Sequence, residues 1–491
     1  MKRTHVESYK QGPTFTPVEK AQGSISADTT DTARHELSNA VHPPIGELGP
    51  NVYLERQAAW ESNARTYPRR IPIAIKNAKG VHVTDTEGRT YFDCLAGAGA
   101  LALGHNHPVV VQAIQQMLAE GLPMQTLDLT TPVKDQFVQT LFASLPAEFS
   151  SNARVQFCGP SGADAVEAAI KLVKTATGRR SMLAFHGAYH GMTHGALGLT
   201  ADLGPKKPIA GLMPEVHFLP YPHHYRCPFG LGGEAGHRTA STYVERLLDD
   251  PNSGIVPAAG MILEVVQGEG GVIPAPDDWL RKIRGITRER TIPLIIDEVQ
   301  TGLGRTGALY AFQHAGITPD VVVLSKAIGG SLPLSVVVYN ADLDRWAPGA
   351  HAGSFRGNQM AMATGTATIK YIQDHHLDQH AWQMGERLMM HLREIQSEIR
   401  SFGEVRGRGL MVGVEVIDPD VRPDEWGCFP PSPSTAARIQ SESLRRGLIL
   451  ELGGRYASVV RFLPPLIVSS EQIDDIASIF REAVKAAVRD R

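Results

Sequence analysis

The chain has 491 residues, of which 42% are hydrophobic and 20% are charged, and its formal net charge at pH 7 is −3. This balance is ordinary for a soluble globular protein, and so small a charge gives no indication of nucleic-acid binding. No apolar run approaches the roughly 18–20 residues that a membrane-spanning helix needs. The length exceeds the usual size of one hydrophobic core, so we expect at least two domains.

The four cysteines and the N-terminus indicate a cytoplasmic protein. Cys94, Cys158, Cys227 and Cys428 form no C-x-x-C pair and are typical of reduced thiols. The first residues, MKRTHVESYKQG, lack the apolar stretch of a signal peptide. Residues 1–50 are rich in Thr, Ser, Pro, Gly and His, so we expect a poorly ordered arm or an arm that packs on a partner subunit.

The sequence becomes periodic after residue 50. A helix is expected at NVYLERQAAWESNART, and a β-hairpin follows around Glu87-Gly88. A second helix is expected to begin at Pro108 and to end before Gly121. We assign residues 51–115 to the first part of a small domain.

Strands and helices alternate between about residues 120 and 345. Strands are expected at ARVQFCG, RSMLAFHG, GMILEVVQ, IPLIIDE and DVVVLSK, with helices at SGADAVEAAIKLVKTATG and WLRKIRGITRER. Short, nearly continuous apolar runs are typical of strands that crossover helices cover on both faces. The sequence therefore predicts a doubly wound α/β domain with a mixed sheet, which we place at residues 116–385.

The rest of the chain is predicted to be α+β. Helices at NQMAMATGTATIKYIQDHH and DQHAWQMGERLMMHLREIQSEIRSF precede strands at VRGRGLMVGVEVID and YASVVRFLPPL and a last helix at SEQIDDIASIFREAVKAAVRD. The C-terminal strands are able to pair with the strands near residues 80–93. Residues 386–491 would then complete a small α+β domain that both chain ends form.

The stretch IPLIIDEVQTGLGRTG contains a G-x-G-x-x-G pattern, at Gly302, Gly304 and Gly307. This pattern is a fingerprint of NAD-binding folds, and Asp320 follows at about the distance of a ribose-binding acid. In those folds the first glycine lies at the strand end and a helix begins inside the pattern. Here five residues separate the strand from the first glycine, and Asp320 precedes a strand instead of ending one. The context therefore disfavours an NAD-dependent dehydrogenase.

Asp297 and Lys326 each end an expected strand, at the edge where open α/β sheets bind ligands. This pair suits pyridoxal 5'-phosphate (PLP), because a lysine attaches the cofactor covalently and an aspartate keeps its pyridine nitrogen protonated. The alternative is a structural salt bridge between the two strand ends.

Two further stretches favour the cofactor. In CGPSGADAVEAAIK, small residues open a helix at Ser161, Gly162 and Ala163, and a helix N-terminus binds phosphate well. In FHGAYHG, Tyr189 follows a strand and is placed to lie on the cofactor ring. The alternatives are a plain N-cap at Ser161 and a core aromatic side chain at Tyr189.

The stretch LIIDEVQTGLGRTGALYAFQHAGITPDVVVLSKAIGGSLPLS resembles the signature of class III PLP-dependent aminotransferases, which have fold type I. The resemblance extends in pieces from about residue 51 to residue 466. DCLAGAGALALGHNHP, FHGAYHGMTHGAL, EVVQGEGG and AGSFRGNQMAMATG are similar to the diaminobutyrate–2-oxoglutarate aminotransferase branch. The resemblance implies a large PLP-binding domain and a small domain.

This resemblance implies roles at the matching positions around the ring. Lys326 would hold the cofactor and carry the proton, and Asp297 would pair with the pyridine nitrogen. Gln300 would bind the ring hydroxyl. Tyr189 would stack on the ring, with His190 beside it.

The resemblance also implies a phosphate site and a homodimer. Ser161, Gly162 and Ala163 would bind the phosphate through the start of their helix. Ser354 stands where relatives usually carry a threonine that reaches the phosphate of the neighbouring subunit's cofactor. Because Ser354 keeps the hydroxyl, we expect a homodimer whose active site is shared across the interface.

Glu264, Glu269 and Arg461 would form the substrate site. In similar enzymes the glutamate at position 269 pairs with the arginine of the RFLPPL strand and hides it while a terminal amine reacts. Glutamate would release Arg461 by bringing its own α-carboxylate. The implied reaction transfers the amino group of L-glutamate to L-aspartate 4-semialdehyde and gives L-2,4-diaminobutyrate and 2-oxoglutarate. The alternative for Glu269 and Arg461 is a structural ion pair.

One position departs from many class III relatives, which carry an arginine for a distal carboxylate where this chain has Met192. Arg69, Arg70 and Arg356 are candidates to replace that arginine, and the sequence does not separate them.

Other functions stay open at this point. A relative with the same fold could act on ornithine or 4-aminobutyrate, catalyse racemisation, or serve as a non-catalytic regulator. No metal site is expected, because HGMTH lacks the Glu of H-E-x-x-H and HHYRC lacks a second ligand pair.

Overall fold

A seven-stranded sheet with the order β4-β12-β11-β10-β7-β5-β6 forms the centre of the larger domain in the computed structural model, which describes residues 49–489. Its strands are β4 Ala153–Phe157, β5 Ser181–Phe185, β6 Val216–Leu219, β7 Ala258–Leu263, β10 Leu294–Asp297, β11 Val321–Leu324 and β12 Val336–Asn340. Strand β12 is antiparallel to both neighbours, and the other pairings are parallel. The predicted doubly wound mixed sheet is confirmed.

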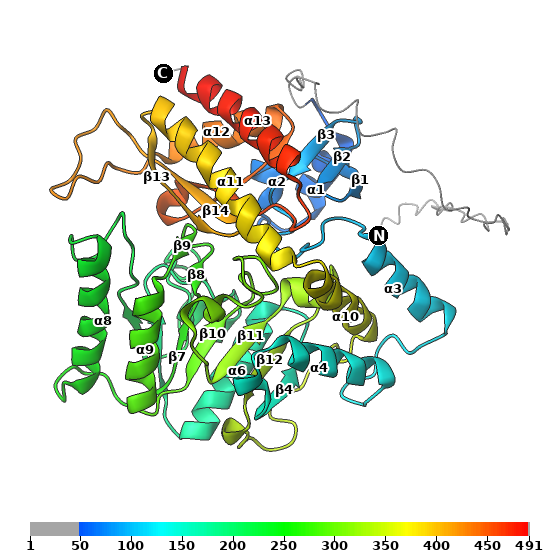
Figure 1. Ribbon diagram of the computed structural model, residues 1–491, viewed down its shortest axis with the longest axis vertical. Helices are drawn as coiled ribbons and strands as arrows, with labels where there is room; N and C mark the ends of the chain where they lie inside the picture. The colour runs from blue at the N-terminus through cyan, green and yellow to red at the C-terminus, as the bar shows by residue number, and fades with distance from the viewer. Residues whose placement is uncertain (1–48, 490–491) are drawn as a thin grey trace, which may run out of the picture. The chain divides into compact units, whose positions relative to one another are not determined.

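Helices cover both faces of this sheet, and α8 and α9 lie side by side at one end of it (Figure 1). The helices of this region are α4 Pro132–Ser144, α5 Ala147–Ser150, α6 Gly162–Thr177, α7 His194–Leu199, α8 Gly233–Asp249, α9 Asp277–Glu289 and α10 Gln359–Asp374. Leu294 and Ile296 of β10 pack into one cluster with Trp279 of α9, whereas Ile295 packs with Val166 of α6 in another cluster. Because side chains alternate along a strand, one continuous apolar run fills two cores.

The two chain ends form two further sheets of four strands each, with orders β1-β2-β3-β15 and β13-β14-β17-β16. The strands are β1 Ile75–Lys79, β2 His82–Asp85, β3 Thr90–Asp93, β13 Phe402–Arg408, β14 Met411–Val416, β15 Leu448–Ile449, β16 Glu451–Gly453 and β17 Val459–Phe462. As predicted, the two chain ends are joined, through the parallel pairing of Leu448 with Phe92. The strands expected at residues 405–418 and 456–466 instead pair with each other in the second of these sheets.

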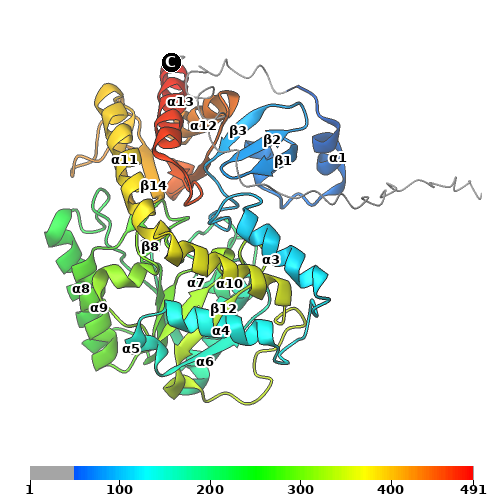
Figure 2. The ribbon, with the colours of Figure 1, turned by 45° about the vertical axis from the view of Figure 1, so that its right-hand side comes forward.

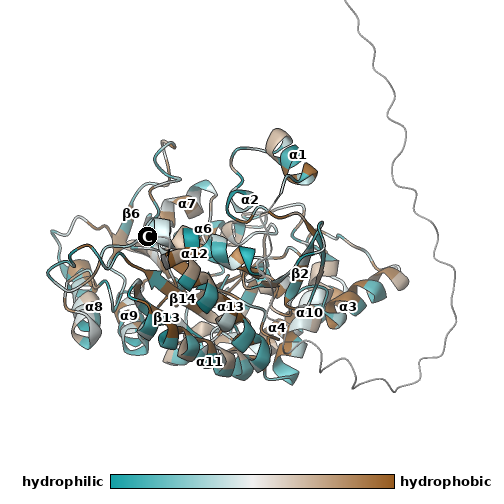
Figure 3. Cartoon of the chain, turned by 90° about the horizontal axis from the view of Figure 1, so that it is seen from above, coloured by the Kyte–Doolittle hydropathy of each residue, from teal (hydrophilic) through white to brown (hydrophobic). Residues whose placement is uncertain are grey.

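The remaining helices lie mostly at the chain ends, and α3 runs beside α10 (Figure 2). They are α1 Val52–Trp60, α2 Tyr67–Arg70, α3 Pro108–Ala119, α11 Leu377–Glu398, α12 Pro433–Arg445 and α13 Ser470–Arg489. Hydrophilic residues mark the outer helix α11, whereas the fully buried strand β14 is hydrophobic (Figure 3). The domain boundaries at residues 51–115, 116–385 and 386–491 stay predictions, and the predicted arm lies outside the described residues except for its last two.

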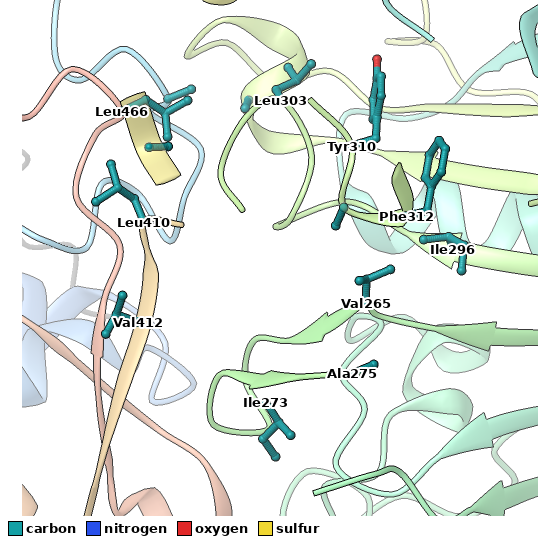
Figure 4. Close-up of a cluster of buried hydrophobic side chains, with 14 of the residues drawn as sticks. Val265, Ile273, Ala275, Ile296, Leu303, Tyr310, Phe312, Leu410, Val412 and Leu466 are labelled. Carbon is teal, nitrogen blue, oxygen red and sulfur yellow. The ribbon is translucent and has the colours of Figure 1, made fainter. Parts of the chain in front are cut away.

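The glycine-rich segment after β10 connects the larger sheet to β14 and to the segment that follows β17. Its Leu303 belongs to a buried cluster with Leu410 and Leu466 (Figure 4). Arg305 is 2% exposed and donates to the carbonyl oxygen of Leu410 over 3.1 Å. Gly304 adopts a φ of 90°, and a Cβ there would lie 3.3 Å from Leu466. The glycines therefore permit close packing, and since turns, not a helix, follow β10, the NAD interpretation is rejected.

Candidate active site

Lys326 and Asp297 lie at the C-terminal ends of neighbouring parallel strands. Strand β10 ends at Asp297, which pairs with Val323 of β11, and Lys326 follows β11 directly after Ser325. Lys326 has a φ of 51°, in the left-handed region that residues with a side chain rarely adopt. Backbone strain of this kind is concentrated at functional sites, where the surrounding structure holds it.

The surroundings of Lys326 favour its neutral form. Burial lowers the pKa of its ammonium below 10.5, while the attraction of Glu269 opposes this shift and Arg461 adds to it. A lysine with a lowered pKa is neutral more often, and only the neutral amine acts as a nucleophile or a base.

Asp297 is held in one orientation by contacts to both of its oxygens. One oxygen lies 2.8 Å from Nδ1 of His190, and the other accepts the Val299 backbone N–H at 3.0 Å. His190 is 3% exposed, and its backbone N–H donates to the Thr200 hydroxyl. Nε2 of His190 is buried and has no hydrogen-bond partner among the described residues. The orientation of the Asp297 carboxylate is therefore fixed. A carboxylate that binds the pyridine nitrogen of PLP needs a fixed orientation of this kind.

The N-terminus of α6 provides free backbone donors next to these strand ends. Ser161 caps the helix, and its hydroxyl oxygen accepts the Asp164 N–H at 3.3 Å. Within the described part of the chain, the N–H groups of Gly162 and Ala163 donate no hydrogen bond. Together with the helix dipole, such groups bind an anion such as phosphate.

Glycine at position 162 is required by the close approach of α6 to the strand ends. A Cβ on Gly162 would lie 2.9 Å from Cγ1 of Val299. We expect Gly162→Ala to weaken PLP binding roughly ten-fold, because overpacking costs about 1–3 kcal/mol and displaces the donors. Titration of PLP-free protein with PLP measures this change. Gly285→Ala in α9, where a Cβ meets no atom within 4 Å, is the matched control and should leave PLP affinity unchanged.

Glu264 supports the segment that carries Tyr189. Its two oxygens accept the backbone N–H groups of Tyr189 and Gly268, each at 3.0 Å. Tyr189 is partly buried, and burial raises the pKa of its hydroxyl, with Glu269 adding to the shift. Burial also raises the pKa of Glu264 from 4.5 to about 7. Glu264 therefore fixes the position of Tyr189 at the edge of the site.

This raised pKa predicts how the stability of the PLP-free protein changes with pH. Because the folded-state pKa of Glu264 exceeds 4.5, the folded chain holds this proton more tightly than the unfolded chain does. The resulting stabilisation is complete below about pH 4.5 and is lost as the pH rises through 7. Glu264→Gln removes the titration, so its unfolding free energy relative to wild type should rise by roughly 1–3 kcal/mol from pH 5 to pH 8. Denaturant unfolding at several pH values measures this difference, and a constant difference would contradict the shift.

Arg461 is fully buried and sits within a network of three polar side chains. Its Nη1 atom lies 2.8 Å from a Glu269 oxygen and 3.4 Å from Oε2 of Glu451. Its Nη2 atom donates to Oε1 of Gln300 at 3.1 Å, and Nε2 of Gln300 donates to the Ala98 carbonyl oxygen. Burial lowers the pKa of Arg461, but the two carboxylates outweigh it, and the net shift is upward. The guanidinium is therefore charged and held between two acids.

Sequence reasoning missed two residues of this network, Glu451 and Tyr67. Glu451 faces Arg461 across the antiparallel pair β16–β17. Its Oε1 atom accepts the Tyr67 hydroxyl at 2.9 Å. A strand of three residues leaves no periodic pattern, so this pairing could not be predicted from the sequence.

The other predicted positions lie apart from this network. Ser354 and Met192 are exposed, and no contact links either side chain to Lys326 within residues 49–489. Among the candidate arginines, Arg356 pairs with Asp128 and Arg69 bonds to Asn63. Arg70 alone adjoins the site. Its side chain lies 3.5 Å from the Leu452 carbonyl oxygen, and its charge lowers the pKa of Glu269.

These features fit PLP. A buried lysine with a lowered pKa, an oriented carboxylate and a helix start with free donors match the reactive carbon, the ring nitrogen and the phosphate of the cofactor. The buried, unpartnered Nε2 of His190 leaves a further polar atom open beside Asp297.

Comparisons with known proteins identify the family of the chain. The model of the family "Aminotransferase class-III" matches residues 64–484. The diaminobutyrate–2-oxoglutarate aminotransferase of Rhizobium meliloti is 58% identical over 88% of this chain and 92% of its own length. The enzyme of the same name from Haemophilus influenzae is 49% identical over 89% of this chain and 96% of its own length.

A solved structure gives the same result for the fold. The crystal structure of a thermostable omega transaminase from Pseudomonas jessenii, a 6-fold mutant, matches with a TM-score of 0.79 and 26% identity, over 89% of this chain and 99% of the other. The predicted fold class is thus confirmed, and the chain belongs to the class III aminotransferase family.

Proposed function

We propose that this protein is a PLP-dependent aminotransferase that transfers the amino group of L-glutamate to L-aspartate 4-semialdehyde, giving L-2,4-diaminobutyrate and 2-oxoglutarate reversibly. The observation that carries this proposal is the buried Arg461–Glu269 ion pair in the electrostatic environment of Lys326. The two relatives named diaminobutyrate–2-oxoglutarate aminotransferase, which are 58% and 49% identical to this chain, support the choice of substrate.

The residues around the strand ends have separate tasks in this proposal. Bound PLP supplies an electron sink for the carbon that carries the amine. Lys326 attaches the cofactor and then moves the proton from that carbon. Asp297 holds the proton on the ring nitrogen, with His190 orienting the carboxylate. Gln300 would bind the ring hydroxyl.

The phosphate and the ring face would be bound by residues outside the two strand ends. Ser161, Gly162 and Ala163 would bind the phosphate through the start of α6. Tyr189 would cover the ring, positioned by Glu264.

The ion pair explains how one site handles two different substrates. Arg461 is fully buried, whereas the side chain of Glu269 is 35% exposed, so Glu269 is the partner that is free to move. The α-carboxylate of glutamate replaces Glu269 on the guanidinium, because a bidentate contact of this kind is strong. With diaminobutyrate the reacting end carries no carboxylate, and Glu269 keeps Arg461 neutralised.

A panel of amines tests this substrate assignment. Purified enzyme loaded with PLP is given 2-oxoglutarate and one amine at a time, and glutamate formation is measured by mass spectrometry. We expect L-2,4-diaminobutyrate to exceed ornithine and 4-aminobutyrate in kcat/KM. A preference for either of the other two would instead assign a different class III activity, and reaction with none of them would contradict the proposal.

We further propose a homodimer. Residues 124–129 pair with residues 357–359 through backbone hydrogen bonds. This surface carries large exposed apolar side chains, namely Met124, Leu127, Leu129 and Phe355, which are 48–69% exposed. Exposed apolar groups in one region mark an interaction surface. Ser354 lies next to Phe355, so an interface there would support its predicted role at the partner's phosphate.

Charging this surface should separate the subunits. We expect wild-type protein to have twice the 53.2 kDa mass of one chain in light-scattering chromatography, and Phe355→Asp to lower the mass toward one chain. The free energy of subunit association becomes less favourable by several kcal/mol when a charge is buried at the interface without a partner. Leu203→Asp, at a 64% exposed leucine elsewhere, is the control and should leave the mass unchanged. An unchanged mass for Phe355→Asp would contradict this interface.

The chemistry of the chain also supports a cytoplasmic location. All four cysteines are free thiols, and two of them are buried. Among the described residues, we find no helix that is long and apolar enough to cross a membrane.

A further inference from the structure

Glu451 is an acid of the site with a buried oxygen, Oε2, that accepts no hydrogen bond among the described residues. Both oxygens of Glu264 accept backbone N–H groups, and both oxygens of Asp297 are bonded. Glu269 pairs with Arg461 at 2.8 Å. Glu451 is 6% exposed, and its Oε2 atom is buried with no hydrogen-bond partner in the described part of the chain.

The charges around Glu451 are unbalanced. One guanidinium, that of Arg461, faces two carboxylates, and the contact to Glu451 is the longer one at 3.4 Å. Burial raises the pKa of Glu451, and Arg461 opposes this shift only in part. A buried carboxylate oxygen without a donor costs about 1–3 kcal/mol, and more when it is charged. A cation that arrives with the substrate would remove this cost.

Glu451 also lies within electrostatic reach of the reacting groups. Its charge partly opposes the lowering of the pKa of Lys326 and adds to the rise in the pKa of Tyr189. The Tyr67 hydroxyl donates to its other oxygen at 2.9 Å and so fixes the direction in which Oε2 points. The acid is thus oriented by Tyr67 at one oxygen, while the other oxygen has the 3.4 Å contact to Arg461 and accepts no hydrogen bond within the described residues.

We propose that Glu451 is a specificity-determining residue that selects substrates carrying a second ammonium group besides the reacting amine. This inference rests on the proposed function and names its substrate class, a diamino acid whose α-ammonium is bound by the carboxylate. An amine of the same length without that group leaves Oε2 without a hydrogen bond and binds less well. Sites built to pair a polar group discriminate strongly against analogues that lack it.

A matched pair of substrates isolates this effect. 4-Aminobutyrate is L-2,4-diaminobutyrate with hydrogen in place of the α-amino group, and both carry the same carboxylate and the same reacting amine. Holoenzyme is mixed rapidly with each amine, and the decay of the visible absorbance of bound PLP gives the rate of one half-reaction at each concentration. The ratio of kcat/KM for the two amines is the measured quantity.

Glu451→Gln keeps the shape of the side chain and removes its charge. We expect the diaminobutyrate to 4-aminobutyrate ratio to fall at least ten-fold, through KM more than through kcat, because charge-assisted hydrogen bonds contribute about 1.5–3 kcal/mol. Glu442→Gln, at a carboxylate that pairs with Arg445 and Arg446 on α12, is the control and should keep the wild-type ratio.

The outcomes separate this inference from the proposed function. If wild type reacts well with diaminobutyrate and Glu451→Gln keeps the wild-type ratio, Glu451 does not select the ammonium and the inference is overturned while the function stands. If wild type does not react with diaminobutyrate, both are overturned. Should Glu451→Gln not fold, Glu451→Asp keeps a carboxylate but withdraws it by one methylene, and its ratio should lie below that of wild type. A wild-type ratio in Glu451→Asp would then overturn the inference.

Discussion

Replacing Lys326 with alanine is expected to abolish turnover together with the visible absorbance of covalently bound PLP. Lys326 would both attach the cofactor and move the proton, and loss of the proton transfer alone costs roughly 10²–10⁴-fold in rate. Loss of the nucleophile removes the attachment as well. Absorbance spectra of purified protein with added PLP, and turnover with glutamate, measure the two losses separately.

Lys171→Ala is the matched control for this variant. Lys171 lies on the exposed face of α6, where its Nζ atom donates to the Ala350 carbonyl oxygen. This change should leave the spectrum and the rate as in wild type. A Lys326→Ala protein that keeps both the absorbance and turnover would show that another residue holds the cofactor.

The second large effect is expected from Asp297→Asn, which keeps the size of the side chain and removes its charge. Without the carboxylate, the ring nitrogen loses the partner that keeps it protonated, and the electron sink weakens. Removing one preorganised electrostatic contact of this kind typically costs 10²–10³-fold, so we expect the glutamate half-reaction to slow by at least ~10²-fold. PLP should stay bound through Lys326, so the spectrum distinguishes slow chemistry from cofactor loss.

Asp320→Asn provides a control from the opposite end of the same sheet. Asp320 precedes β11, pairs with Arg284 at 2.6 Å and accepts the Leu294 N–H. Its replacement should lower stability and leave the half-reaction rate nearly unchanged. If Asp297→Asn and Asp320→Asn slow the glutamate half-reaction equally, the effect of Asp297 comes from its contribution to the fold and not from contact with the cofactor.

The sequence was sufficient to place the residues at the ends of two short, buried apolar strands. Asp297 and Lys326 could be predicted because β10 and β11 are continuous buried runs, and parallel strands end at one edge. The helix start at which we propose that the phosphate binds could be predicted because Ser161 and Gly162 open a long helix. In each case one local pattern determined both the element and the position of the residue.

Features that depend on pairing between distant segments could not be predicted in this way. Glu451 meets Arg461 only because the short strand β16 pairs with β17, and it meets Tyr67 across 384 positions of the chain. The glycines after β10 resembled a nucleotide-binding loop, because a glycine pattern shows where the backbone is conformationally free. It does not show which structural feature uses that freedom. Their purpose, the packing of Leu303 against Leu410 and Leu466, appears only in the folded chain (Figure 4). The role of Ser354 depends on a second chain and stays a prediction.

In the proposed reaction, the enzyme transfers an amino group from glutamate to the aldehyde carbon of L-aspartate 4-semialdehyde. The most direct measurement supplies glutamate with an isotopically labelled amino nitrogen, together with the aldehyde and PLP-loaded enzyme, and locates the label by mass spectrometry of product fragments. We expect L-2,4-diaminobutyrate with the label on its C4 nitrogen alone, formed in equal amount with 2-oxoglutarate and absent with Lys326→Ala. Unlabelled diaminobutyrate, or no diaminobutyrate from active and PLP-loaded enzyme, would contradict it.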